Sequence, residues 1–296
     1  MNALLVPLIR PPSLRPGDRV VVVAPSSPFP RSELLAGLGW LRDRYDVRIA
    51  SAAFAREGFL AGSDDRRAGE LGAAMESPEV KAIVAARGGY GVTRITERLP
   101  WAALRAHPKW LVGFSDITAL HVGALTAGVC SIHAPNVTGL WRASPADRLA
   151  FMRALEVPEG AAPMSGLSPV RAGDAKGTVV GGNLSLLAAV AAAGPLPIPD
   201  GAIWLLEDVT ERPYRIDRLL TALVPHLRRA GAVVFGEFDK CDAGPDGVTV
   251  EDVLRDRASA WSAPTYAGAP FGHGTQNRAF VVGAQAELRS GTLHLW

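Results

Sequence analysis

Short apolar runs alternate with segments of helical periodicity along the first half of the sequence. Uninterrupted apolar runs are typical of strands buried in a parallel sheet, and spacing of apolar residues by three and four is typical of helices. The expected strands are Val20–Ala24, Val47–Ile49, Ala82–Ala85 and Trp110–Gly113, and the expected helices are Ser32–Leu41, Asp64–Met75 and Ile117–Leu125. Because the two patterns alternate, the sequence predicts an α/β fold with its chemistry at the carboxyl ends of parallel strands.

A second region with the same pattern follows a stretch rich in Pro, Gly, Ala and Ser between about Glu156 and Gly173. Loss of periodicity in such a composition marks a connection between domains. We therefore expect an N-terminal domain at residues 1–160, a linker at 161–175 and a C-terminal domain at 176–296. The second domain is expected to contain strands at Gly177–Val180, Ile203–Leu206 and Ala232–Phe235 and helices at Arg215–Leu227 and Thr249–Ala258.

Composition narrows the class of protein. Among 296 residues, 31 basic and 29 acidic side chains give a formal charge of +2 without long runs of one sign, so nucleic acid is not indicated as a partner. Cys130 and Cys241 stand apart without a CxxC pattern, which argues against a disulfide framework or a zinc site. Met1–Arg10 has neither a basic start nor a cleavage site, and a cytoplasmic location is expected, with export by a leaderless route left open.

Ser115 is the candidate nucleophile. It lies in Gly113–Asp116, directly after an expected strand and directly before an expected helix. A serine at such a corner is exposed above the sheet edge, where the helix N-terminus offers amide groups to an oxyanion. The match to G-x-S-x-G is incomplete because Ile117 replaces the second glycine, and a serine in this position is also a common helix N-cap.

A serine nucleophile needs a general base, and His273 is the preferred candidate. It lies between two glycines in Pro270–Gly274, a tight and uncrowded loop. His133 is the second candidate. The other histidines, for which a structural or solvated role is expected, are His107, His121, His226 and His294.

The base must in turn be oriented by a carboxylate. Glu207 ends an expected strand, where loops gather, and is preferred to Asp208 and Glu211 on the following loop. The alternative is that the acidic pair 207–208 caps the next helix or pairs with nearby arginines at the surface.

A glycine-rich segment, Arg87–Gly91, follows the third expected strand. Its spacing fits neither a phosphate loop nor a dinucleotide fingerprint. Glycines allow close approach of the backbone to a ligand, so the segment could donate an amide to an oxyanion, although a plain tight turn remains the alternative. Arg87 is a candidate for binding the terminal carboxylate of the substrate, with a solvated surface position as the alternative. Asn183, which opens another helical segment, is a candidate for substrate contact, with a plain turn as the alternative.

In this order, the segments resemble the LD-carboxypeptidase family of serine peptidases, which also includes the microcin C self-immunity peptidases. The resemblance covers the whole chain. The segments that carry it are Leu14–Val20, Val23–Ser27, Ala86–Gly91, Leu111–Thr118, Gly181–Leu184, Leu205–Val209 and Phe271–His273.

The resemblance implies an N-terminal flavodoxin-like domain, a C-terminal swivelling α/β domain and a homodimer. It implies Ser115 as nucleophile, His273 as general base and Glu207 as the residue that orients the base. The implied oxyanion hole consists of the main-chain amides of Gly89 and Asp116, and the Asp116 side chain has no catalytic role.

The implied reaction is hydrolysis of the amide between an L-centre and a terminal D-amino acid, with release of D-Ala from murein tetrapeptide in cell-wall recycling. No metal or organic cofactor is implied. One departure is Val281, which replaces a proline that relatives commonly show after the catalytic histidine. The short distance in sequence between Glu207 and His273 favours a murein-recycling member.

Three other functions compete with this interpretation. A hydrolase of peptidyl-nucleotides from the same family would need an aromatic platform, for which Trp141 is a candidate, although a core position is an equal alternative. A non-catalytic cleft-type binding protein would use Ser115 only as a cap. A nucleotide-dependent oxidoreductase is disfavoured because the first strand runs into Pro25–Ser27 and not into a glycine fingerprint.

Overall fold

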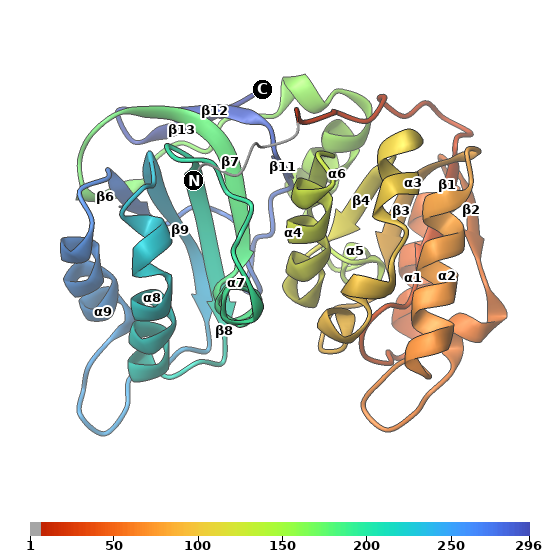
Figure 1. Cartoon of the computed structure of the whole chain (residues 1–296), viewed down its shortest axis with the longest axis horizontal. Coiled ribbons are helices and arrows are strands. Elements are labelled where there is room, and N and C mark those ends of the chain that lie inside the picture. The colour runs from red at the N-terminus through yellow and green to blue at the C-terminus, as the bar shows by residue number, and fades with distance from the viewer. Residues whose placement is uncertain (1–6) are drawn as a thin grey trace. The chain divides into compact units, whose positions relative to one another are not determined.

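The computed structural model describes residues 7–296, which divide into two compact units (Figure 1). The first unit contains the chain up to Pro158 together with Ala279–Val281, and the second contains Glu159–Arg278 and Val282–Trp296. Part of Met1–Arg10, residues 1–6, lies outside the described residues.

A six-stranded sheet forms the centre of the first unit. Its strands are β1 (Arg19–Val23), β2 (Asp46–Ile49), β3 (Val80–Ala85), β4 (Trp110–Gly113), β5 (Ser131–His133) and β11 (Phe280–Val282). The order is β11-β5-β4-β3-β1-β2, with β1 to β5 parallel. This is the flavodoxin-like order with a strand added at one edge, so the predicted fold is confirmed. The order reverses between β1 and β3, which is where ligands bind in such sheets.

Helices of the first unit pack in two groups. They are α1 (Arg31–Arg42), α2 (Asp64–Glu76), α3 (Trp101–Ala106), α4 (Thr118–Thr126), α5 (Val137–Leu140) and α6 (Pro145–Glu156). Helix α1 packs on α5, and α2, α3 and α4 pack in succession. Helices α1 and α5 approach closely, because a Cβ on Gly37 of α1 would lie 1.9 Å from the carbonyl oxygen of Val137 of α5. Apolar helix faces therefore cover the buried strands that the hydrophobic pattern predicts.

A seven-stranded mixed sheet forms the centre of the second unit, in the order β13-β12-β7-β8-β9-β10-β6. Its strands are β6 (Ser168–Arg171), β7 (Ala175–Asn183), β8 (Ile203–Val209), β9 (Ala232–Asp239), β10 (Thr265–Ala267), β12 (Gln285–Arg289) and β13 (Thr292–Leu295). Strands β7 to β10 are parallel, and β6, β12 and β13 pair antiparallel with their neighbours. Helices α7 (Leu184–Ala193), α8 (Pro213–Leu227) and α9 (Val250–Arg257) lie side by side along this sheet (Figure 1).

The stretch 161–175, expected to be a linker, belongs to the second unit in the structure and contains β6. The open edge of β10 provides the pairing partner, which local periodicity does not reveal. Val281 lies in β11, at the edge of the first sheet. Both cysteines are buried and free, and no helix in the described part of the chain is long and apolar enough to cross a membrane.

Candidate active site

The corner between β4 and α4 holds Ser115 in a strained conformation. Its φ is 66°, in the left-handed region that residues other than glycine adopt only at an energetic cost. A short 3-10 turn, Ser115–Ile117, follows the strand, and α4 begins at Thr118 without a side-chain cap. The structure therefore does not use Ser115 as the N-cap of α4. A strained serine between strand and helix is the arrangement of a nucleophile elbow.

Two buried polar side chains, Asn136 and His121, support this corner; a structural or solvated role was expected for His121, and Asn136 was not among the candidates. The amide of Phe114 donates to Asn136 Oδ1 over 3.2 Å. His121, on α4, makes hydrogen bonds with the carbonyl oxygen of Gly113 at 3.0 Å and with Ser131 Oγ at 2.9 Å. Burial lowers the pKa of His121 to about 4, so the ring is neutral and acts as a fixed hydrogen-bonding partner of the strand end.

The glycine-rich segment after β3 lies against the serine. A Cβ on Gly88 would lie 2.8 Å from Ser115 Cβ, and a Cβ on Gly89 would lie 2.5 Å from Ser27 Oγ. Gly89 also has a φ of 105°, and the amide of Tyr90 donates to Ser27 Oγ over 3.1 Å. Only glycine fits this double approach, so the segment is more than a generic tight turn.

The Asp116 side chain connects the loops that surround Ser115. It is fully buried, and its Oδ2 accepts hydrogen bonds from Ser26 Oγ at 2.7 Å and from the amide of Val92 at 2.9 Å. Burial raises the pKa of Asp116, although these two donors oppose that shift. The carboxylate thus ties the loop after β1 to the loop after β3. Sequence reasoning missed Ser26, although its place directly after the first strand was a usable signal.

The second unit brings His273 and Glu207 together. His273 Nδ1 lies 2.6 Å from Glu207 Oε2, and the Glu207 side chain is fully buried within β8. Burial raises the pKa of Glu207. Burial also disfavours the imidazolium of His273, but the hydrogen bond and charge of Glu207 outweigh it and raise the pKa of His273. A carboxylate that holds one ring nitrogen fixes the tautomer and stabilises a protonated ring.

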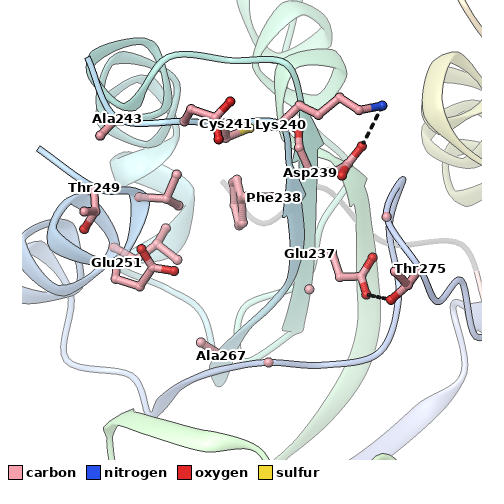
Figure 2. A pocket seen from close by; sticks show the side chains of 16 residues that line it. Glu237, Phe238, Asp239, Lys240, Cys241, Ala243, Thr249, Glu251, Ala267 and Thr275 are labelled. Carbon is pink, nitrogen blue, oxygen red and sulfur yellow. Dashed lines mark hydrogen bonds and ion pairs between the residues drawn. The ribbon is translucent and has the colours of Figure 1, made fainter. Parts of the chain in front are cut away.

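The loop that carries His273 passes close over Glu237 of β9. A Cβ on Gly274 would lie 2.1 Å from Glu237 Oε2, and Gly272 has a φ of 140°. Figure 2 shows Glu237 at the wall of a pocket of about 620 Å³, where Thr275 Oγ1 donates to Glu237 Oε1 over 3.2 Å. The two glycines beside the histidine therefore meet a steric need of this loop.

Asp208 and Asn183 have structural contacts at the ends of β8 and β7. Asp208 Oδ2 accepts hydrogen bonds from the amide and the hydroxyl of Ser185, at the start of α7. Asn183 caps α7 by accepting from the amide of Leu186 at 3.1 Å and donates to Asp208 Oδ1 at 2.9 Å. Capping of the next helix, considered for the acidic pair, does not occur, because α8 begins after Arg212 without a side-chain cap and Asp208 instead contacts the start of the preceding helix α7. A substrate contact by Asn183 stays a prediction.

The remaining candidates lie elsewhere. His133, the reserve base, is fully buried and stacks on Phe280 at 4.4 Å between ring centroids, so it belongs to the core. Trp141 is 43% exposed, with the Arg142 guanidinium 5.0 Å from its ring centroid, so it is not a core residue. Among residues 7–296, no group of three His, Cys, Asp or Glu side chains is arranged to hold a metal ion.

Two domain families match the chain. Residues 20–134 match the LD-carboxypeptidase N-terminal domain, and residues 176–288 match the LD-carboxypeptidase C-terminal domain. A murein tetrapeptide carboxypeptidase of Pseudomonas aeruginosa is 34% identical over 295 residues, which cover 93% of this chain and 94% of the relative. A Streptomyces coelicolor protein that carries a carboxypeptidase name is 40% identical over 97% of this chain and 96% of its own.

Solved structures agree with these matches. The muramoyltetrapeptide carboxypeptidase of Oxalobacter formigenes is 29% identical, with a TM-score of 0.84 over 94% of this chain and 97% of its own. The microcin C7 self immunity protein shares the fold at 17% identity, with a TM-score of 0.84 over 98% of both chains. Matches to both domains, in order and over nearly the whole length, establish that this chain belongs to the LD-carboxypeptidase family.

Proposed function

We propose that this protein is a serine LD-carboxypeptidase that releases the terminal D-Ala of murein tetrapeptide. The observation that carries the proposal is the strained Ser115 at the β4 corner, pressed against a glycine loop whose backbone faces it closely. Membership of the LD-carboxypeptidase family supports it, as does the similarity to two carboxypeptidases named for this substrate. In the proposal, Ser115, His273 and Glu207 act as the catalytic triad.

In the first half of the reaction, Ser115 Oγ attacks the carbonyl carbon of the scissile amide. His273 accepts the hydroxyl proton at the ring nitrogen that does not face Glu207. The buried Glu207 carboxylate stabilises the resulting imidazolium. The main-chain amides of Gly89 and Asp116 stabilise the negative charge on the carbonyl oxygen.

In the second half, the C–N bond breaks and His273 gives its proton to the departing D-Ala nitrogen. The acyl group then remains as an ester on Ser115. A water molecule attacks the ester carbon while His273 accepts a proton from it, and collapse of this second tetrahedral intermediate returns the proton to Ser115 Oγ. The products are the murein tripeptide and free D-Ala.

Release of D-Ala from purified murein tetrapeptide, followed by mass spectrometry, tests the proposal. We expect release by the wild type and none above background by a folded Ser115→Ala variant. A peptidyl-adenylate offered in parallel covers the alternative substrate class. Turnover of that substrate alone would refute the murein assignment and leave Ser115 as the nucleophile. Binding of peptide without turnover of either substrate would favour a binding protein.

Two further parts of the proposal rest on the family resemblance. We propose a homodimer, which light scattering coupled to size-exclusion chromatography tests, since a mass near the 31.2 kDa of one chain would refute it. A cytoplasmic location is proposed because murein tripeptides are reused inside the cell, and fractionation of cells tests it. A third part rests on the residues alone: Arg87 is proposed as an anion-binding side chain of the site.

A further inference from the structure

A basic pocket lies at the carboxyl edge of the first sheet, beside the loop that carries the proposed oxyanion amide. Its volume is about 530 Å³, and three arginines, Arg31, Arg56 and Arg87, line it together with the aromatic rings of Phe29 and Phe54. No acidic residue lines it in the described part of the chain. The pocket therefore concentrates positive charge in a protein whose overall charge is nearly balanced.

The three guanidinium groups make no ion pair with any carboxylate among residues 7–296, whereas Arg66, Arg67, Arg94 and Arg98 around the same sheet edge do. The Arg31 guanidinium lies 4.7 Å from the ring centroid of Phe54, and Arg87 Nη1 donates to the carbonyl oxygen of Pro28. These contacts orient two of the groups without neutralising them. Unpaired arginines with fixed orientation are the usual means of binding a carboxylate or phosphate.

The position of the pocket indicates which part of a peptide it could reach. Its walls follow β1, β2 and β3, whereas Ser115 follows β4 in the order β4-β3-β1-β2. Neighbouring strands lie about 4.8 Å apart, so the loops after β1 and β2 start roughly 10–14 Å from the serine corner. An extended peptide covers that distance with about three or four residues, and with fewer where the arginine side chains extend toward it.

Arg31 and Arg56 lie in the loops that start farthest from Ser115, so the carboxylate of the released residue is the less favourable ligand for them, whereas Arg87 adjoins Gly88 and lies nearer the serine. Only three covalent bonds separate the scissile carbonyl carbon from the carboxyl carbon of a terminal amino acid, which is about 4 Å at most. A group that reaches Arg31 and Arg56 is therefore better placed in the acyl part of the substrate, on the other side of the bond.

Resting on the proposed function, we propose that Arg31, Arg56 and Arg87 form a subsite for a free carboxylate in the acyl part of the peptide. A γ-linked D-glutamyl residue, whose α-carboxylate stays free, presents such a group. The aromatic rings of Phe29 and Phe54 would exclude water around the ion pairs between the carboxylate and the arginines and would strengthen them. The subsite would select acidic peptides over amidated ones.

Two synthetic tetrapeptides test the proposal: L-Ala-γ-D-Glu-L-Lys-D-Ala and the same peptide with the α-carboxylate amidated. We expect the wild type to have a kcat/KM roughly 10- to 100-fold higher for the acidic peptide, mainly through KM. In the double variant Arg31→Met, Arg56→Met this ratio should fall close to one, with the amidated peptide cleaved as by the wild type. Arg42→Met, at the other end of α1, is the matched control and should keep the wild-type ratio.

Equal kcat/KM values of the wild type for both peptides, or an unchanged ratio in the double variant, would overturn the subsite. Calorimetry of the acidic peptide with Ser115→Ala separates this failure from failure of the proposed function. One outcome is that the wild type cleaves neither peptide while the acidic peptide binds Ser115→Ala but not the triple variant Ser115→Ala, Arg31→Met, Arg56→Met. In that case the subsite is supported and the proposed reaction is refuted. Binding of adenosine monophosphate in place of either peptide would refute the carboxylate assignment.

Discussion

Substitution of Gly88 by alanine should impair catalysis while leaving the fold intact. The backbone at Gly88 has no positive φ, so alanine can adopt it. Its methyl group, however, would lie 2.8 Å from Ser115 Cβ and 3.0 Å from Ser115 Oγ. Ordinary contacts begin near 3.4 Å, so the serine or the glycine loop must move by about 0.6 Å.

The size of the expected effect follows from that displacement. Misplacement of a reacting group by about 1 Å can cost about 100-fold in rate, so we expect kcat/KM to fall roughly 10- to 100-fold. The free energy of unfolding should fall by only about 1–2 kcal/mol, because local overpacking is partly offset by the smaller entropy of the unfolded chain. Initial rates of D-Ala release and urea unfolding measure the two quantities.

A second glycine provides the control. Gly69 lies within α2, and a Cβ there would meet no atom within 4 Å. Gly69→Ala should therefore keep the wild-type kcat/KM and raise the free energy of unfolding by up to about 1 kcal/mol. If Gly88→Ala retains the wild-type kcat/KM, the glycine loop does not constrain the serine, and the argument from close packing at this corner fails.

Three further substitutions test other parts of the site. Glu207→Gln should lower kcat/KM by on the order of 10³-fold or more. The carboxylate raises the pKa of His273, whose neutral form is the base, so its loss should move the acid limb of the pH profile of kcat/KM to lower pH. An acid limb that does not move would exclude the His273–Glu207 pair from catalysis. Asp116→Ala leaves the buried amide of Val92 without its acceptor. It should lower the free energy of unfolding by about 1–3 kcal/mol and should also lower activity. If stability and activity both stay at the wild-type level, Asp116 does not hold the two loops together. Gly181→Ala would place Cβ 1.9 Å from the carbonyl oxygen of Leu205 in β8, at a residue whose φ is 144°. It should lower the free energy of unfolding by roughly 2–5 kcal/mol, as measured by thermal and urea unfolding. Gly194→Ala is the control, because a Cβ there meets no atom within 4 Å, and it should not destabilise the protein.

Local sequence patterns predicted most of the buried parallel strands and the longer helices. They succeeded because those elements contain the hydrophobic run or the helical spacing within themselves, as in β4 and α8. The patterns failed for short strands whose partners are distant in sequence. Strand β6 is exposed and contains a proline, so only its pairing with β10 defines it.

The residues of the candidate site likewise differ in whether a local sequence pattern could predict them. Ser115 and the glycine loop could be predicted because strand, turn and helix are adjacent in the chain. The hydrogen bond between His273 and Glu207 joins residues 66 positions apart. The sequence offered each as the preferred candidate of its type, but the alternatives His133, Asp208 and Glu211 stayed open until the family resemblance was considered. The supporting contacts of Asn136, His121 and Asp116 depend on how loops meet, which no local pattern encodes.

Strand β11 has a consequence for biosynthesis. Residues 279–281 complete the sheet of the first unit, but they are synthesised about 120 residues after the rest of that unit. While the ribosome makes the second unit, β5 therefore remains an open strand edge, which favours pairing with other chains. A chain truncated at Pro158 should accordingly aggregate more than the full-length protein, and a chaperone that shields strand edges should matter most during this interval of translation.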